Sequence, residues 1–197
     1  MARKQGSHSD ITGPRIHAAA LKLFAEHGFA AVSMRQIAAE VGVQAGAIYN
    51  YVPHKQALLA NLMRGHMDGL LADIEPHLPE GDPMAALDAF VRFHIGYHLD
   101  RVDLVFISYM ELRALEPENF DLITRLRGDY EKRLERILID GTRDGVFDIA
   151  DPKITTLALI AMLTGVTNWY REGGRLDQGD IADHYAAMAR RMVCAAP

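Results

Sequence analysis

The chain has 197 residues, of which 49% are hydrophobic and 24% are charged, and its formal net charge is −5. This length suits one compact domain or a small module joined to a larger one, and the composition excludes a disordered or fibrous chain. A single cysteine excludes a disulfide framework, and the longest apolar stretch, residues 157–166, is too short to cross a bilayer. Residues 1–14 are polar and lack the apolar segment of a secretory signal, so we expect a cytoplasmic protein that does not contact membranes.

The charge is divided unevenly along the chain. Residues 1–55 carry six lysines and arginines and three acidic residues. The remaining residues carry 15 lysines and arginines and 23 acidic residues. The net charge is therefore +3 on the first segment and −8 on the rest. This division predicts a basic N-terminal region that attracts phosphates, joined to an acidic body.

Helical periodicity extends through nearly the whole sequence, and no convincing hairpin of alternating strands interrupts it. Glycines, prolines and capping residues separate the periodic segments. We predict an all-α protein of about nine helices, at residues 16–27, 34–39, 43–51, 54–78, 83–100, 103–115, 116–144, 152–170 and from 180 onward.

Residues 34–53 fit a helix-turn-helix, in which two short helices cross closely. Ala38 is small enough for the second helix to pass over it, and Gly42 suits the left-handed conformation of the turn. The positions of the small shared core are apolar or half-apolar: Ile37, Val41, Val43, Ile48 and Tyr51. Suitable residues at all these spacings, behind a first helix capped by Ser33, predict a DNA-binding motif.

The sequence SMRQIAAEVGVQAGAIYNYVPHKQALL, with the preceding ALKLFAEHGF, resembles the DNA-binding domain of the TetR family of bacterial repressors. The resemblance is close over residues 15–60 and extends to the length and helical character of the rest. It implies that the second helix of the motif enters the major groove, and that a dimer binds a pseudo-palindromic operator and represses transcription. Two positions depart from the family. Lys or Arg is common where Ala45 stands, and Phe is common where Val52 stands, so the resemblance does not imply a base preference.

Side-chain chemistry assigns roles within the second helix of the motif. Gln44 can pair with adenine, Ala45 can contact a thymine methyl, and Gly46 lets the backbone approach the bases. The Tyr49 hydroxyl is expected to reach a phosphate oxygen. Tyr51 either does the same or contributes to the small core.

Further residues are candidates for contacts with the DNA backbone. We expect Lys55 to hold a phosphate in the first turn of the next helix. Ser33 is either a phosphate contact or only a helix cap, and Arg35 is either a phosphate contact or a solvated charge. Arg3 and Lys4 are either a minor-groove arm or an unengaged tail.

We divide the chain into a flexible arm (residues 1–14), a DNA-binding domain (15–55) and a ligand-binding and dimerisation domain (56–197). Residues 157–166 are apolar nearly all round, so their helix must be covered on more than one side. The cover is either a partner subunit or the core of a monomer. TetR-like repressors form a four-helix bundle from the last two helices of each subunit, so the resemblance implies a homodimer.

The middle of the body is predicted to hold a small apolar ligand. Its candidate walls are aromatic and methionine side chains, each of which can instead be plain core: Phe93, Tyr97, Phe106, Tyr109, Met110 and Met162. The run GVTNWYREGGRL resembles a branch of TetR-like regulators that respond to acyl-coenzyme A thioesters. The resemblance implies that Trp169 stacks on a flat ring and that Arg171 or Arg175 meets phosphates; alternatively, Trp169 packs in the dimer interface beside a solvated connector.

No catalytic or cofactor-binding motif is present, so we expect no enzymatic activity and no cofactor. His94 and His98 have a spacing that can hold a metal, but no Cys or acid at a companion spacing supports them, which favours two core or pocket-edge histidines. The alternative to a regulator is a helical ligand-binding or interaction protein without DNA-binding activity. Such a protein would lack the steep loss of DNA affinity with rising salt that a DNA-binding protein shows.

Overall fold

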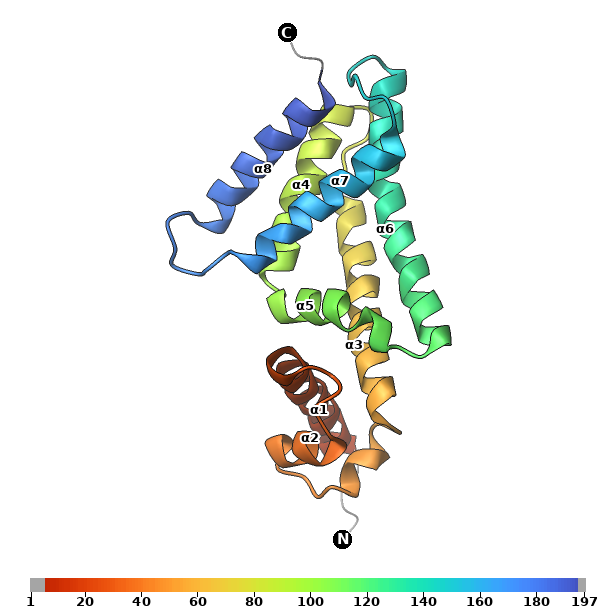
Figure 1. Cartoon of the computed structure of the whole chain (residues 1–197), viewed down its shortest axis with the longest axis vertical. Coiled ribbons are helices and arrows are strands. Elements are labelled where there is room, and N and C mark those ends of the chain that lie inside the picture. The colour runs from red at the N-terminus through yellow and green to blue at the C-terminus, as the bar shows by residue number, and fades with distance from the viewer. Residues whose placement is uncertain (1–5, 195–197) are drawn as a thin grey trace. The chain divides into compact units, whose positions relative to one another are not determined.

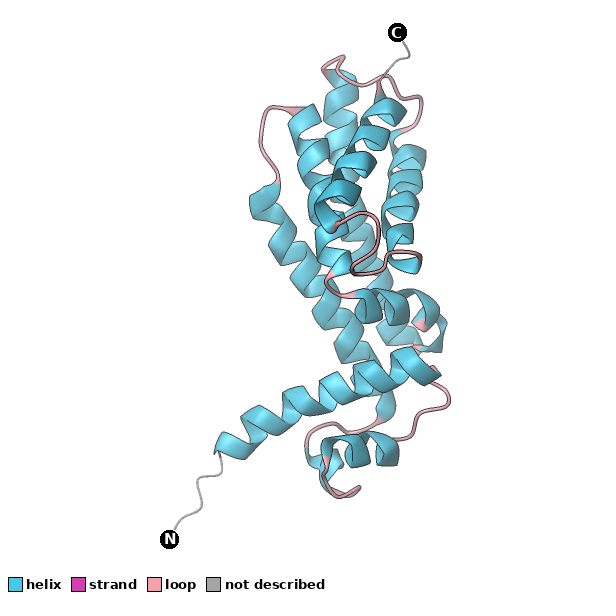
Figure 2. Ribbon diagram, turned by 90° about the vertical axis from the view of Figure 1, so that its left-hand side faces the viewer, coloured by secondary structure: helices cyan, strands magenta, loops and turns pink. Residues whose placement is uncertain are grey.

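The computed structural model describes residues 6–194, with side chains from residue 12 onward. The described residues form eight α-helices and four short 3-10 turns and contain no strand, which confirms the predicted all-α fold (Figure 2). The chain forms two compact units, the first of Met1–His66 and Asp103–Ile123 and the second of Met67–Val102 and Thr124–Pro197. In the first of these packing units a later segment joins the N-terminal one; the division into DNA-binding and ligand-binding domains at residue 55 stays a prediction.

The first unit is built around the N-terminal helices. It contains α1 (Gly6–His27), α2 (Met34–Val41), the 3-10 turn η1 (Ala47–Asn50), the start of α3 (Lys55–Ile74), most of α5 (Val102–Met110), the 3-10 turn η3 (Leu112–Ala114) and the start of α6 (Pro117–Arg143). Its largest fully buried side chains are Ile16, Phe24, Ile37, Ile48, Leu58, Leu59 and Met63. Both long helices, α3 and α6, continue from this unit into the second.

The first helix begins earlier than predicted. The arm expected over residues 1–14 is helical from Gly6 onward, and Arg3 and Lys4 lie outside the described residues. Polar residues carry no apolar periodicity that would reveal a helix in the sequence, yet a formed helix can extend through them with one hydrogen bond per added residue. Pro14 lies inside α1 and lacks the N–H for one such bond, and Ile16 anchors the helix directly after it by full burial.

The second unit contains the rest of α3 and α6, the 3-10 turn η2 (Glu75–His77), α4 (Pro83–Leu99), α7 (Pro152–Thr164), the 3-10 turn η4 (Gly165–Asn168) and α8 (Gln178–Val193). Helices α7 and α8 both pack against α4 (Figure 1). The core of this unit includes the fully buried Leu87, Phe90, Leu134, Leu159 and Leu163. No helix in the described part of the chain is long and apolar enough to cross a membrane.

The helix starts of the second unit follow local sequence signals. Asp82 and Asp151 each accept two backbone N–H groups at 2.9–3.0 Å, and each is followed by a proline that opens the helix. The bounds of α7 and α8 are among those that differ from the prediction. Helix α7 ends at Thr164 and continues only as a 3-10 turn, and α8 starts at Gln178 because Asp177, paired with Asp180 in a capping box, is its N-cap.

Candidate functional site

Helix α2 begins at a complete capping box. The Ser33 hydroxyl oxygen accepts the Gln36 backbone N–H at 3.3 Å, while the Gln36 side-chain oxygen accepts from the Ser33 backbone N–H at 2.8 Å. The same Gln36 oxygen also accepts from the Ser33 hydroxyl at 2.7 Å. The predicted cap is therefore confirmed, and a phosphate contact from Ser33 would have to replace a hydrogen bond within this box.

The turn of the motif has the geometry that the sequence predicts. Gly42 adopts the left-handed conformation, with a φ of 77°, and its N–H donates to the carbonyl of Ala39 at 3.1 Å. Ala38 is almost completely buried, as are Ile37 and Ile48, so the two halves of the motif share a small apolar core. These contacts hold the segment after Gly42 in a fixed position against α2.

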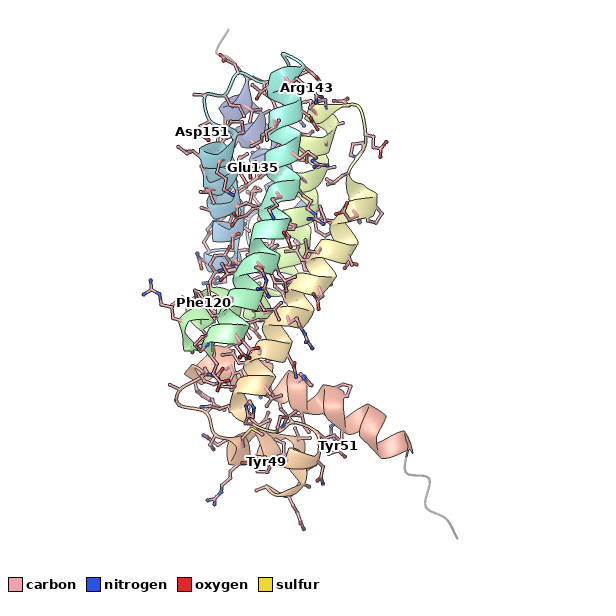
Figure 3. The ribbon with its side chains drawn as sticks, turned by 90° about the vertical axis from the view of Figure 1, so that its right-hand side faces the viewer. Tyr49, Tyr51, Phe120, Glu135, Arg143 and Asp151 are labelled. Atoms are coloured by element: carbon pink, nitrogen blue, oxygen red, sulfur yellow. The ribbon has the colours of Figure 1, made fainter. Side chains whose placement is uncertain are left out.

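That segment is a 3-10 turn, Ala47–Asn50, instead of the α-helix predicted over residues 43–51. It stays short because Gly46 has a low helix propensity and Pro53 excludes the preceding residue from the helical region. The buried Ile48 anchors it, while its neighbours on the chain point outward: Gln44, Ala45, Gly46, Tyr49 and Asn50 are exposed. Tyr51 is half-buried, in agreement with a share in the core, and both tyrosines are labelled in Figure 3.

Two of the basic residues of α1 are used within the first unit. Arg15 donates from Nη2 to the carbonyl of Val41 at 2.8 Å, at the C-terminal end of α2. Lys22 pairs with Glu40 at 2.8 Å, and this hydrogen bond raises the pKa of the Lys22 ammonium. Both contacts place a cation at the negative end of α2, where it stabilises the helix.

Lys55 is also directed inward. Its ammonium donates to the carbonyls of Phe29 and Val32, both at 2.7 Å, and to that of Ala30 at 3.4 Å. It also lies 4.3 Å from the centroid of the Phe29 ring. This differs from the predicted phosphate contact, because the ammonium is held by the loop between α1 and α2. Arg35, in contrast, is exposed and pairs with no carboxylate among the described residues.

The predicted ligand contacts of the second unit occupy two kinds of environment. Tyr97 is buried, its ring lies 5.4 Å from that of Phe93, and burial raises the pKa of its hydroxyl. Met162 is half-buried against the core. Trp169 is half exposed and stacks on Tyr185 at 6.4 Å. Arg171 and Arg175 are exposed on the connector that follows.

The remaining three predicted ligand contacts lie on α5, in the first unit. Phe106, Tyr109 and Met110 are 41%, 47% and 66% exposed. They occupy the outer side of the helix because Val105 and Ile107 take its buried side. Their role as ligand contacts stays a prediction.

His94 and His98 form a buried polar cluster on α4. Their rings stack at 3.9 Å, and the two ring nitrogens of His94 are hydrogen-bonded, at 3.1 Å each, to the hydroxyls of Tyr130 and Thr164. His98 Nδ1 is 2.8 Å from the carbonyl oxygen of His94. Among the described residues no group of three His, Cys, Asp or Glu could hold a metal ion. Both histidines are buried and hydrogen-bonded.

The second unit also has an open groove of about 670 Å³ beside α6. Its apolar lining includes Leu78 and Ile137, and its charged lining contains ion pairs such as Arg133 with Glu75 at 2.9 Å. None of the predicted ligand contacts lines this groove. It is therefore a different feature from the aromatic pocket that the sequence predicts.

Comparisons with known proteins decide the family. The model for bacterial regulatory proteins of the tetR family matches residues 16–62, and the model for the tetracyclin repressor-like C-terminal domain matches residues 80–193, more than half of the chain. This chain belongs to the TetR family. The resemblance seen in the helix-turn-helix is thereby confirmed, and the matched families are transcriptional regulators, not enzymes.

Relatives of this TetR-family regulator share both sequence and fold. The transcriptional repressor KstR2 of Rhodococcus jostii (strain RHA1) is 27% identical over 173 residues, which are 86% of this chain and 84% of that protein. A tetR-family regulatory protein from Rhodococcus RHA1 has a solved structure with a TM-score of 0.89 and 30% identity, over 95% of this chain and 99% of that one. AibR, solved with isovaleryl coenzyme A and operator DNA, shares the fold at a TM-score of 0.81 and 24% identity, over 90% and 97% of the two chains.

The structure adds one candidate that the sequence analysis missed. Asn50 is exposed directly after Tyr49 in the DNA-binding motif of this TetR-family protein, and its amide can donate and accept hydrogen bonds. In the predicted helix over residues 43–51 the N-terminal residues face the bases, whereas the observed 3-10 turn is short and ends at Asn50. The polar character of Asn50, in a stretch without any charged residue from 41 to 53, was the available signal.

Proposed function

We propose that this TetR-family regulator binds a pseudo-palindromic operator as a homodimer, represses transcription in the cytoplasm and is released by a small apolar effector. The observation that carries the proposal is the exposed, uncharged surface formed by residues 44–50 on the buried anchor Ile48. A surface of amide, small and tyrosine side chains suits direct contact with base edges and phosphate oxygens.

Each exposed residue of this surface has a chemical role in the proposal. Gln44 reads adenine through its amide, and Ala45 contacts a thymine methyl. Gly46 lets the backbone approach, while Tyr49 and Asn50 donate to phosphates. Because no cation lies on this surface, phosphate attraction comes from Arg35 and from the net positive charge of residues 1–55.

The homodimer is supported by apolar faces on the last two helices. Helix α7 exposes Ile154 (65%) and Leu157 (47%), while Leu159 and Leu163 on its other side are fully buried against the core. Helix α8 exposes Met188 and Met192, which are 38% and 42% accessible. Two exposed apolar stripes on helices that pack on the same α4 favour a partner subunit over the core of a monomer.

The effector class is proposed from the connector between α7 and α8. AibR, which shares this fold, has been solved with isovaleryl coenzyme A. In this chain Trp169 offers a half-exposed ring for a flat base, and Arg171 and Arg175 follow as exposed cations for phosphates. Phe93, Tyr97 and Met162 are the proposed contacts for the acyl chain within the second unit.

DNA binding is tested by selecting duplexes from a random-sequence library with the full-length protein. The expected result is enrichment of a motif with two inverted half-sites, about one helical turn apart, and an affinity that falls steeply as salt rises. Recovery of no motif, or an affinity independent of salt, contradicts the proposal.

The effector class is tested by the thermal unfolding midpoint with isovaleryl coenzyme A, isovaleric acid and coenzyme A alone. A ligand that binds only the folded state adds about 2.7 kcal/mol at 100 times its dissociation constant. A shift with the thioester but not with the free acid supports the proposed class. No shift with this thioester or with longer-chain thioesters contradicts it and leaves DNA binding untouched.

A further inference from the structure

Helix α5 carries an exposed apolar face within the first unit. Phe106, Tyr109 and Met110 recur at helical spacing, so they lie on one side of the helix, and all three are exposed. The opposite side is held inside the unit, because Val105 and Ile107 are almost completely buried. Large apolar side chains gathered on one face of a helix indicate a surface that another molecule covers. These three residues are called the α5 face below.

A charged residue stands at each end of the α5 face. Asp103 comes before the apolar residues, in the first turn of the helix, and Arg113 comes after them, on η3. Both are exposed, and neither pairs with an opposite charge among the described residues. The intervening Glu111 is used inside the unit, where its Oε1 accepts the backbone N–H of Phe29 at 2.9 Å. The α5 face is therefore bordered by an acid at one end and by a base at the other.

This pattern is complementary to itself when two copies of α5 pack antiparallel. Asp103 then faces Arg113 of the partner subunit, and Phe106 faces Met110 of the partner subunit. Both pairs have the same midpoint in the sequence, so a single register forms both. Tyr109 lies next to that midpoint and is brought close to Tyr109 of the partner subunit. A surface that pairs with itself in this way is isologous, the type through which identical chains form two-fold dimers.

The α5 face is too small to hold two chains together by itself. Three side chains of one short helix bury far less than the roughly 1,200 Å² at which stable interfaces begin. The face therefore needs a larger interface beside it, which the proposed contact through α7 and α8 supplies. A single two-fold axis shared by both contacts closes the assembly at two chains, whereas a separate axis would join dimers into larger assemblies. The copy that covers the α5 face is thus the partner subunit of the same dimer.

We propose that the α5 face packs antiparallel on the α5 face of the partner subunit and forms a second contact of the homodimer. This inference rests on the proposed function, because it presupposes the homodimer formed through α7 and α8. Helix α5 from Asp103 onward and the helix-turn-helix belong to one compact unit. A contact between the two α5 helices therefore fixes the separation of the two DNA-binding surfaces. That separation selects the spacing between the half-sites of the operator.

Cross-linking at Tyr109 tests the contact in the full-length protein. Cys194 is first replaced by serine, because it is exposed and could form disulfides of its own. In this background Tyr109→Cys is expected to form a disulfide between two chains, in a particle that sedimentation shows to contain two chains. The matched control is Glu118→Cys, an exposed position of the same unit outside the α5 face. It should cross-link about tenfold more slowly or less, because a disulfide requires Cα atoms within about 7 Å.

Charge reversal tests the register of the two helices. In the Tyr109→Cys background, Asp103→Arg sets like charges against Arg113 of the partner subunit and should slow cross-linking about tenfold. Arg113→Asp should slow it equally. The protein with both reversals, Asp103→Arg and Arg113→Asp, again sets opposite charges face to face and should recover the original rate. Circular dichroism and an unfolding midpoint establish that each variant is folded. Should Tyr109→Cys not fold, Phe106→Cys with Met110→Cys replaces it in every measurement.

Three results overturn the contact while the proposed function stands. The first is cross-linking at Tyr109→Cys no faster than at Glu118→Cys, which leaves the three side chains of the α5 face to their predicted ligand role. The second is a disulfide that joins two dimers into a particle of four chains. The third is an equal rate in all charge variants. A native protein that sediments as a monomer, both free and on its operator, instead overturns the homodimer and this contact with it.

Discussion

The two units use their basic side chains differently. In the first unit, Arg15 and Lys55 donate to backbone carbonyls, and Lys22, which pairs with Glu40, is the exception. In the second unit several basic residues pair with carboxylates, as Arg133 does with Glu75 and Arg190 with Asp88, while Arg101 donates to the backbone carbonyl of Tyr97. A carbonyl satisfies a cation without cancelling its charge, whereas a carboxylate cancels it. Residues 1–55 therefore combine internally bonded cations with a net charge of +3, which attracts DNA over distance.

The largest effect is expected from a change in the proposed dimer interface of the second unit, because the proposed operator binding depends on the dimer. Leu157→Asp places a charge in the proposed dimer interface, which should cost about 3 kcal/mol or more of dimer stability and lower operator affinity about a hundredfold. Sedimentation and operator titration measure the two effects. Ile139→Asp is the matched control, because Ile139 on α6 is 48% exposed and Leu157 is 47% exposed. Equal losses in both variants, or a Leu157→Asp protein that remains dimeric, would show that this α7 face is not the interface.

The next largest effect concerns the packing of the second unit alone. A Cβ on Gly141 would stand 2.0 Å from Cδ2 of the buried Phe147, so Gly141→Ala should destabilise the protein by about 3 kcal/mol. Gly128 lies on the same helix with nothing within 4 Å of its Cβ position, so Gly128→Ala should stabilise by about 0.5–1 kcal/mol. Urea unfolding measures both. An equal response at the two positions would mean that Phe147 does not pack against α6.

The sequence predicts the first unit better than the second, for a physical reason. Capping, the left-handed glycine and the small crossing residue act within a few positions, so Ser33, Ala38 and Gly42 are recognisable from spacing alone. The uses of Lys55 and Glu111 depend on partners 23 to 82 residues away. No local pattern encodes such pairs.

The same limit applies to the effector contacts. Aromatic and methionine residues on helices can be core, surface or pocket, and only the packing of distant helices decides among these. The packing of the helices leaves Met110 exposed and Tyr97 buried, although both are predicted ligand contacts. Boundaries fail where polar residues extend a helix, as before residue 16 in α1.

Substitutions of Lys55 and Arg35 test whether the basic side chains of the first unit serve its internal structure or contact DNA. If Lys55 is a structural cation, Lys55→Ala should lower the free energy of unfolding by about 1.5–3 kcal/mol through lost charged hydrogen bonds, with the salt slope of DNA binding unchanged. If Arg35 contacts a phosphate, Arg35→Ala should leave stability unchanged and reduce the salt slope by about 0.9. Urea unfolding and DNA titrations at several salt concentrations separate the two. A reduced slope for Lys55→Ala with full stability would restore the phosphate role and remove the contrast between the units.

The smallest change in DNA affinity is expected from substitutions on the uncharged surface formed by residues 44–50. There, a base-specific loss is to be distinguished from a loss that is equal for all duplexes. Gln44→Ala should cost about 1–2 kcal/mol at one base pair of each half-site and relax preference there, because the amide reads a base edge. Asn50→Ala should weaken binding to all duplexes alike, because its proposed partner is a phosphate. Titration against a set of single-base operator variants distinguishes the patterns. A uniform loss for Gln44→Ala and a base-specific one for Asn50→Ala would exchange the two assignments, and would show that base reading takes place at the end of the turn nearer Pro53.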